Sequence, residues 1–127
     1  MPWEFNHDRP IYLQLIETIQ QNIVNGTYNS GDKLPSVREL ATEAAVNPNT
    51  MQKALSELEK CGLIYTNRTT GRFITDDTHL IEEMKFNAAK ELMHEYLHNM
   101  KNLGFSYKDS AALLQHLVSD DTDEAEY

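Results

Sequence analysis

The chain of 127 residues lacks the usual marks of a secreted or membrane-embedded protein. It holds one cysteine, Cys61, which has no partner for an internal disulfide. No run of apolar residues approaches the roughly 20 needed to span a bilayer. The first ten residues, MPWEFNHDRP, show no basic segment followed by an apolar one. We therefore expect a protein of the reducing cytoplasm with no membrane partner.

The sequence is also short of positive charge. Lys and Arg number 11 against 20 Asp and Glu, and the net charge of -9 has the wrong sign for a partner with a phosphate backbone. The excess acid is unevenly distributed, because residues 1–75 hold seven basic and eight acidic residues, whereas residues 76–127 hold four and twelve. The first part is nearly neutral, and a neutral domain can still present one basic face.

Signatures of an enzyme are missing as well. The chain contains no phosphate-binding glycine loop, no G-x-S-x-G segment and no evident Cys/His dyad. We therefore expect neither catalytic residues nor a cofactor.

Hydrophobic periodicity predicts a mainly helical fold with one small β-hairpin. A first helix is expected over residues 10–25, with Asp8 near its N-terminal cap. The segment SVRELATEA predicts a second helix, because Ser36 and Glu39 have the spacing of a capping box. A third helix follows after a break of only a few residues; its expected N-cap is Asn47, and its first helical residue is a proline.

The order helix, helix, tight turn, helix, hairpin is typical of a winged helix-turn-helix, which we expect over residues 1–75. The hairpin is predicted from β-favouring residues 64–66 and 73–75 with a polar connection between them. In such a unit the helix after the turn enters the major groove of DNA. That helix presents four polar side chains away from its apolar face: Asn49, Gln52, Lys53 and Ser56.

These residue types suit contact with double-stranded DNA. Asn and Gln side chains can bond to adenine edges, and Lys can reach guanine or phosphate. Thr50, together with free backbone N–H groups at the start of the helix, is expected to seat a phosphate. Arg38 on the second helix and Arg68 in the wing add positive charge on either side.

Four segments carry a resemblance to a known family: PIYLQL at 10–15, GDKLPSVRELA at 31–41, VNPNTMQKALSELEKCGLI at 46–64 and TTGRFI at 69–74. Together they closely resemble the GntR transcription regulators. The short remainder of the chain resembles the YtrA subfamily, whose C-terminal helices pair two subunits. The resemblance implies a homodimeric repressor of an inverted-repeat operator, often in a transporter operon. The DNA contacts that it implies are Ser36, Arg38, Asn47, Asn49, Thr50, Gln52, Lys53, Arg68 and Gly71.

The chain departs from the pattern of that family at two places. Ala45 stands where relatives often have glycine in the turn between helices, and alanine tolerates a left-handed backbone less well. Thr69 follows Arg68 where the wing often reads Arg-Gly.

Residues 76–119 are expected to form two helices that pair two subunits, and the acidic residues 120–127 to form a disordered tail. Apolar residues recur there at helical spacing with little core of their own to pack against. The predicted dimer interface is Phe86, Ala89, Met93, Leu97, Met100, Leu113, Leu114 and Leu117. In the alternative arrangement, this stripe packs back on the winged helix of the same chain.

Other hypotheses stay open. His94 and His98 have a spacing that can chelate a metal, although a solvated helix face is the simpler interpretation. A small-molecule effector held between the winged helix and the C-terminal helices would leave no mark in the sequence. Cys61 is either a redox sensor or a small buried residue at a helix end. The chain could also be a protein-interaction adaptor that uses its acidic tail for docking.

Overall fold

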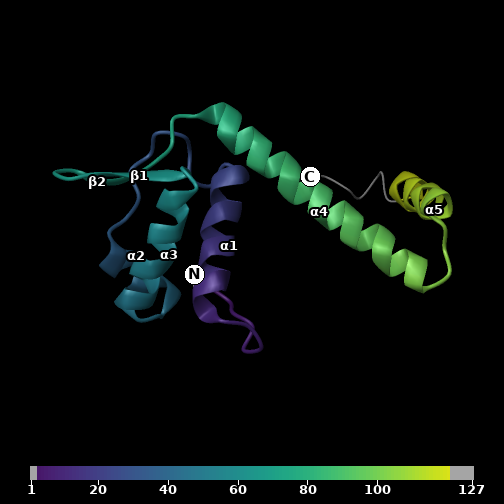
Figure 1. The fold of residues 1–127 in the computed structure, drawn as a ribbon, viewed down its shortest axis with the longest axis horizontal. Coiled ribbons are helices and arrows are strands. Elements are labelled where there is room, and N and C mark those ends of the chain that lie inside the picture. The colour runs from purple at the N-terminus through teal and green to yellow at the C-terminus, as the bar shows by residue number, and fades with distance from the viewer. Residues whose placement is uncertain (1–2, 121–127) are drawn as a thin grey trace. The chain divides into compact units, whose positions relative to one another are not determined.

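The structure, a computed structural model, describes residues 3–120 and confirms a mainly helical fold with one antiparallel hairpin (Figure 1). The chain divides into two compact units, Met1–Lys85 and Phe86–Tyr127. Of the tail expected over residues 120–127, Asp120 instead ends α5, and residues 121–127 lie outside the described residues. The elements are α1 (Ile11–Val24), α2 (Val37–Ala44), α3 (Pro48–Lys60), β1 (Ile64–Asn67), β2 (Gly71–Ile74), α4 (Thr78–Asn102) and α5 (Tyr107–Asp120).

One apolar core holds the first unit together. The inner faces of α1, α2 and α3 share it with the base of the hairpin, and the start of α4 packs against it through Leu80, Ile81 and Met84. Full burial of one such side chain contributes about 1.5–3 kcal/mol, so α3 is firmly oriented by its inner face. The buried residues are Leu15, Ile19, Ile23, Leu34, Leu40, Ala41, Ala44, Met51, Ala54, Leu55, Leu58, Leu63, Ile64 and Ile74.

The hairpin is slightly longer at its tip than predicted, because the first strand continues to Asn67 and the second begins at Gly71, opposite it. On one face Tyr65 stacks on Phe73 with ring centroids 5.6 Å apart. Arg72, the next residue toward the tip, makes an ion pair with Glu59 of α3 at 3.0 Å. The wing is therefore tied to α3 by a side chain as well as by the connecting backbone.

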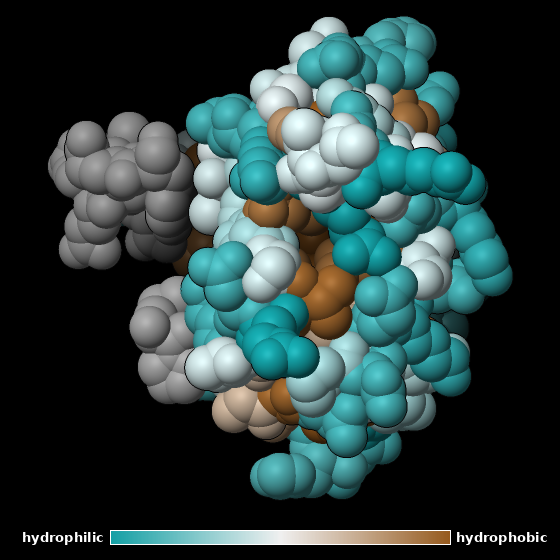
Figure 2. Space-filling model, turned by 90° about the vertical axis from the view of Figure 1, so that its left-hand side faces the viewer, coloured by the Kyte–Doolittle hydropathy of each residue, from teal (hydrophilic) through white to brown (hydrophobic). Residues whose placement is uncertain are grey.

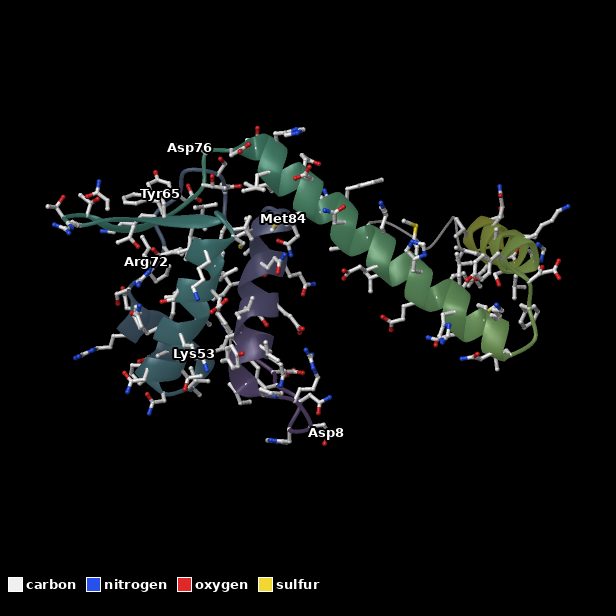
Figure 3. All side chains as sticks on the ribbon, viewed as in Figure 1. Asp8, Lys53, Tyr65, Arg72, Asp76 and Met84 are labelled. Carbon is white, nitrogen blue, oxygen red and sulfur yellow. The ribbon has the colours of Figure 1, made fainter. Side chains whose placement is uncertain are left out.

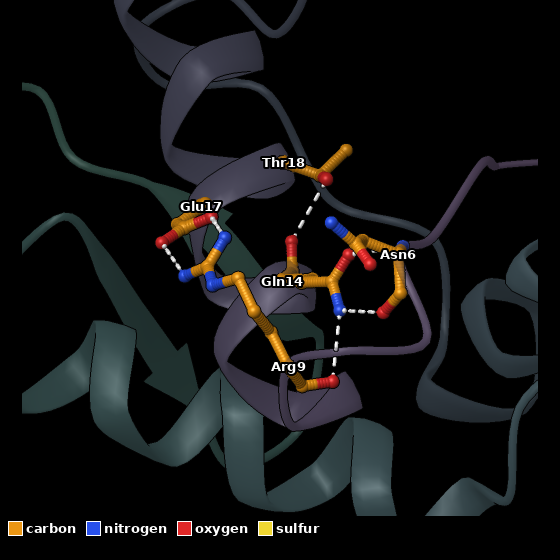
Figure 4. Close-up of polar contacts among 5 residues, drawn as sticks. All are labelled: Asn6, Arg9, Gln14, Glu17 and Thr18. Carbon is orange, nitrogen blue, oxygen red and sulfur yellow. Dashed lines mark hydrogen bonds and ion pairs between the residues drawn. The ribbon is translucent and has the colours of Figure 1, made fainter.

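The N-terminus of α1 has no side-chain cap, although Asp8 lies two residues before the N-cap as expected. The N-cap is Pro10, which has no side-chain hydrogen bond to offer. The buried amide of Gln14 instead accepts from the backbone N–H of Asn6 at 2.7 Å and donates to the carbonyls of Asn6 at 2.7 Å and Arg9 at 3.0 Å (Figure 4). A side chain of the helix thus fastens the segment that precedes it.

The second unit consists of the rest of α4 together with α5. Tyr96 Oη donates to the backbone carbonyl of Ser110 at 2.8 Å, and the Ser110 side chain is fully buried. Most of the larger apolar side chains of this unit are exposed, Phe86 at 61% and Met93 at 53% among them. No helix within residues 3–120 has the length and apolarity of a membrane span.

The turn between α2 and α3 depends on a left-handed residue. Ala45 has φ 58° and ψ 47°, and it is the one residue other than glycine with positive φ in the described part of the chain. The N–H groups of Ala45 and Val46 donate back to the carbonyls of Thr42 and Ala41, the pair of bonds of a Schellman motif. The tight turn expected from the sequence is formed, but an alanine occupies the position that glycine normally fills.

Replacing Ala45 with glycine is expected to stabilise the protein. The left-handed conformation costs an alanine about 1–2 kcal/mol, and the gain is reduced by the greater freedom of glycine in the unfolded chain. The free energy of unfolding in urea should rise by about 0.5–1 kcal/mol. Ala44→Gly is the matched control, because Ala44 is buried in the helix, and it should lower stability. A loss of stability in Ala45→Gly would contradict the assigned strain.

Candidate nucleic-acid interface

The start of α3 is capped as predicted. Asn47 is the N-cap, its Oδ1 accepts from the N–H of Asn49 at 2.7 Å, and Pro48 is the first helical residue. The N–H groups of Thr50 and Met51 both donate to the carbonyl of Asn47, at 3.0 and 3.1 Å. The expectation of free backbone N–H groups here is wrong, because the cap, the proline and the first turn engage or remove these donors. Anion binding at this helix end would have to use side chains.

The outer face of α3 presents the polar residues that the sequence indicates. Asn49, Gln52 and Lys53 are exposed, and Gln52 lies within 3.4 Å of the hydroxyl of Ser56. The Lys53 ammonium does not extend freely into solvent. Lys53 projects from α3 (Figure 3), and its ammonium group lies over the ring of Tyr12, 4.2 Å from the ring centroid. Such cation–π contacts contribute about 0.5–1 kcal/mol at exposed sites, so α1 helps to orient this lysine.

The start of α2 has the predicted capping box. Ser36 Oγ accepts from the N–H of Glu39 at 3.1 Å, and the Ser36 N–H donates to the Glu39 carboxylate at 3.0 Å. The backbone N–H of Ser36 holds the pKa of the Glu39 carboxyl below its usual value, with smaller contributions from the Ser36 hydroxyl and the charge of Lys33. Arg38 is exposed beside this capping box.

The Lys and Arg side chains of residues 3–75 fall into two groups. Three are neutralised by carboxylates, in the pairs Arg9–Glu17, Lys60–Glu57 and Arg72–Glu59. The other four have no carboxylate within 4.0 Å in the described part of the chain: Lys33, Arg38, Lys53 and Arg68. The unpaired cations are the ones that can attract an anionic partner, and three of them are residues singled out by the sequence.

The tip of the wing is shaped by Asn67. Its Oδ1 accepts from both the N–H and the hydroxyl of Thr69, at 3.1 and 3.0 Å, which closes the turn and leaves Arg68 exposed at the tip. Gly71 begins the returning strand with φ 115°. Thr69, which departs from the family pattern, therefore has a structural role in this turn.

Figure 2 looks onto the winged end of the molecule, where hydrophilic residues predominate and some apolar surface shows between them. Beside the start of α3 lies an open hollow of about 430 Å³, bounded by Phe5 and His7 of the N-terminal segment and by Asn47 and Thr50. This hollow lies within the first unit, and the effector site expected from the sequence stays a prediction.

His94 and His98 are both exposed on α4. Within residues 3–120 no group of three or more His, Cys, Asp or Glu side chains is placed to hold a metal ion. Cys61 is exposed at the end of α3, and its thiol donates to the carbonyl of Leu58 at 3.2 Å. The expectation that Cys61 is buried is wrong, because the side chain lies beyond the last residue of the helix that packs on the core.

Sequence reasoning missed two residues of this surface, Lys33 and Tyr12. Each lies beside a residue distant in the sequence, Gly71 for the lysine and Lys53 for the tyrosine. The spacing along the chain contains no signal for such neighbours.

The model of the family described as "Bacterial regulatory proteins, gntR family" matches residues 11–74. Among curated proteins, the chain is 43% identical over 90 residues to the "HTH-type transcriptional repressor YtrA" of Bacillus subtilis (strain 168). That alignment covers 69% of this chain and 68% of the relative.

Solved structures give the same answer. A GntR family transcriptional regulator from Listeria monocytogenes has a TM-score of 0.83 and 43% identity, and the match covers 88% of this chain and 98% of the other. A crystal structure of AraR(DBD) in complex with an operator has a TM-score of 0.54 and 26% identity, covering 59% of this chain and 95% of the other.

The capping box predicts a measurable pH dependence of stability. Because the pKa of the Glu39 carboxyl is lowered in the folded state, the carboxylate contributes to stability at pH values above its ordinary pKa. This contribution is lost as the pH falls through the pKa of the folded state. Between about pH 6 and about pH 3, Glu39→Gln should therefore lose less unfolding free energy in urea than the wild type. Glu43→Gln is the control, since it removes a carboxylate of the same helix without touching the cap. Identical pH profiles for the wild type and Glu39→Gln would contradict the prediction.

Proposed function

The chain belongs to the GntR family of bacterial regulatory proteins, and we propose that this DNA-binding transcriptional regulator acts as a homodimeric repressor. Members of the family are DNA-binding regulators and not enzymes. The observation that carries the proposal is the separation of paired from unpaired cations. Arg38, Lys53 and Arg68 stay free of carboxylates on α2, α3 and the wing, the three elements that a winged helix-turn-helix brings to DNA.

In the proposed complex, α3 lies in the major groove. Asn49 and Gln52 bond to adenine edges through their amides, and Lys53 reaches guanine or phosphate. Thr50 and the amide of Asn47 contact the backbone through their side chains, because the N–H groups of this turn are already engaged. The α3 face supplies most of the sequence discrimination and a smaller part of the affinity.

The remaining contacts position the protein on the duplex. The Ser36 hydroxyl and Arg38 bind phosphate at the start of α2, and Arg68 binds it at the tip of the wing, near Gly71. Phosphate contacts fix register and supply much of the affinity, whereas base contacts carry the sequence information. The operator and its genes lie in the cytoplasm, where the protein is proposed to work.

A second subunit doubles this footprint and imposes two-fold symmetry on the operator, which is then an inverted repeat. The surface proposed for the dimer lies on α4 and α5. Large apolar side chains there are strongly exposed in the single chain, Phe86 at 61%, Met93 at 53% and Leu117 at 56% among them. Burial of this surface supplies the driving force for pairing. The proposed interface is completed by Ala89, Leu97, Met100, Leu113 and Leu114.

Repression is proposed because the relative YtrA is described as a transcriptional repressor. By resemblance to that subfamily, the proposed target is a transporter operon. Selection of bound duplexes from random DNA should yield two half-sites one helical turn or a multiple apart, about 34–36 Å per turn.

Removing two unpaired cations should abolish tight DNA binding. Arg38→Ala combined with Lys53→Ala is expected to lower the affinity for the selected duplex by at least about 10-fold and to make its salt dependence shallower, because charged contacts are lost. Affinity is measured by fluorescence anisotropy over a series of salt concentrations. The control is Lys101→Ala with Lys108→Ala, which makes the same change in net charge on the second unit. If the wild-type protein bound no DNA at low salt, the repressor hypothesis would be overturned and the protein-interaction adaptor hypothesis favoured.

An aspartate in the proposed interface should produce monomers. Leu97→Asp would bury a charge between subunits, at a cost that pairing cannot recover. Sedimentation equilibrium should give the 14.6 kDa of one chain in place of twice that mass. Met93→Asp should do the same without disturbing the unit itself, since Met93 is already 53% exposed. Asn99→Asp adds the same charge at an exposed position of α4 and should leave the dimer intact. An unchanged mass in both interface variants would contradict the assignment.

A further inference from the structure

Of the Lys and Arg side chains without an ion pair within residues 3–75, Lys33 is the one that neither the sequence pattern nor the family resemblance assigns to DNA. The backbone around it is held by the hairpin. Lys33 forms an isolated antiparallel bridge with Phe73, and the N–H of Leu34 donates to the carbonyl of Arg72 at 2.8 Å. The lysine therefore projects from a fixed point at the edge of β2, although it lies outside both strands.

The Lys33 side chain crosses the start of β2 at Gly71. A Cβ added to Gly71 would lie 3.2 Å from Lys33 Cε and 3.9 Å from Nζ. A side chain at that position would have to push the lysine aside, and it would also be strained by the φ of 115°. The absence of a side chain at Gly71 is thus explained within the molecule, because it leaves room for the lysine stem and brings the ammonium group close to the wing.

The field of the same ammonium group also reaches the start of α2. The pKa of the Glu39 carboxyl is lowered chiefly by the backbone N–H of Ser36, and the charge of Lys33 adds to this effect. No carboxylate of the described residues comes within ion-pairing distance of Lys33 itself. Lys33 thus lies between two parts of the proposed DNA surface, the N-terminus of α2 and the wing.

We propose that Lys33 is a phosphate-binding residue that joins the backbone contacts of α2 to those of the wing. The inference rests on the proposed DNA-binding surface and adds a residue to it. A lysine ammonium is a compact point charge with three donors, suited to a phosphate of the backbone rather than to a particular base. Lys33 therefore contributes affinity on every sequence and does not discriminate among bases. Gly71 takes part by leaving space for the lysine, so its contribution to the interface is indirect.

Lys33→Met tests the proposal, because it keeps an unbranched stem over Gly71 and removes the charge. The probe is the duplex that the wild-type protein selects from random DNA, together with a scrambled duplex of equal length. Affinity for both should fall by a similar factor, roughly 10-fold at moderate salt. The slope of log affinity against log salt should become shallower by about 0.9 for each subunit of the complex. Lys60→Met is the matched control, as Lys60 is paired with Glu57 near the end of α3, and it should change neither quantity.

Three outcomes separate the possibilities. Equal slopes of log affinity against log salt for the wild type and Lys33→Met would contradict the role of Lys33 and leave the repressor proposal unaffected. A loss of affinity on the selected duplex alone would also contradict that role, because it would indicate base readout. A wild-type protein that selects no duplex would instead remove the proposed function on which the inference rests. Thermal unfolding of Lys33→Met should match that of the wild type within the few degrees typical of surface substitutions.

Discussion

Burial of the inner face of α3 is the constraint on which the rest of the first unit depends. Met51, Leu55 and Leu58 are at most 1% exposed and pack in the core shared with α1 and α2. Successive residues of a helix are about 100° apart around its axis, so any rotation that exposed these side chains would bury polar ones. The packing that stabilises the fold therefore also determines which side chains face outward. Asn49, Gln52 and Lys53 are exposed to a partner because the apolar residues between them are buried in the core.

The sequence predicted those parts of the fold whose cause is local. Helix periodicity, the Ser36 capping box and the Asn47 cap each depend on residues within one or two turns of one another, and all three are present. The neighbours of Lys33 and Lys53 could not be found in this way. Tyr12 and Lys53 are 41 residues apart and meet only because α1 packs beside α3. The prediction of free N–H groups at the start of α3 was wrong for a local reason. The cap already engages the N–H donors that an anion would use.

The acidic net charge and the basic surface are reconciled by where the ion pairs lie. Exposed ion pairs contribute little to stability, commonly about 0–1 kcal/mol. The pairs of Arg9, Lys60 and Arg72 matter more for the charge that they cancel. The cations outside these pairs remain unopposed at α2, at the middle of α3 and along the wing. A protein with a net charge of -9 can thus hold a basic surface without a basic composition.

The half-buried pair between Arg72 and Glu59 has one more consequence. It joins the hairpin to α3 at 3.0 Å, with the two side chains 19% and 31% exposed. In the proposed complex, a double helix that contacts α3 would therefore meet a wing that is already held in position. The second contact then forms within one complex, at a high effective concentration, and little additional entropy is lost on making it. Under the proposed function, the rigid link between α3 and the wing would thus raise the affinity of two contacts that are each weak alone.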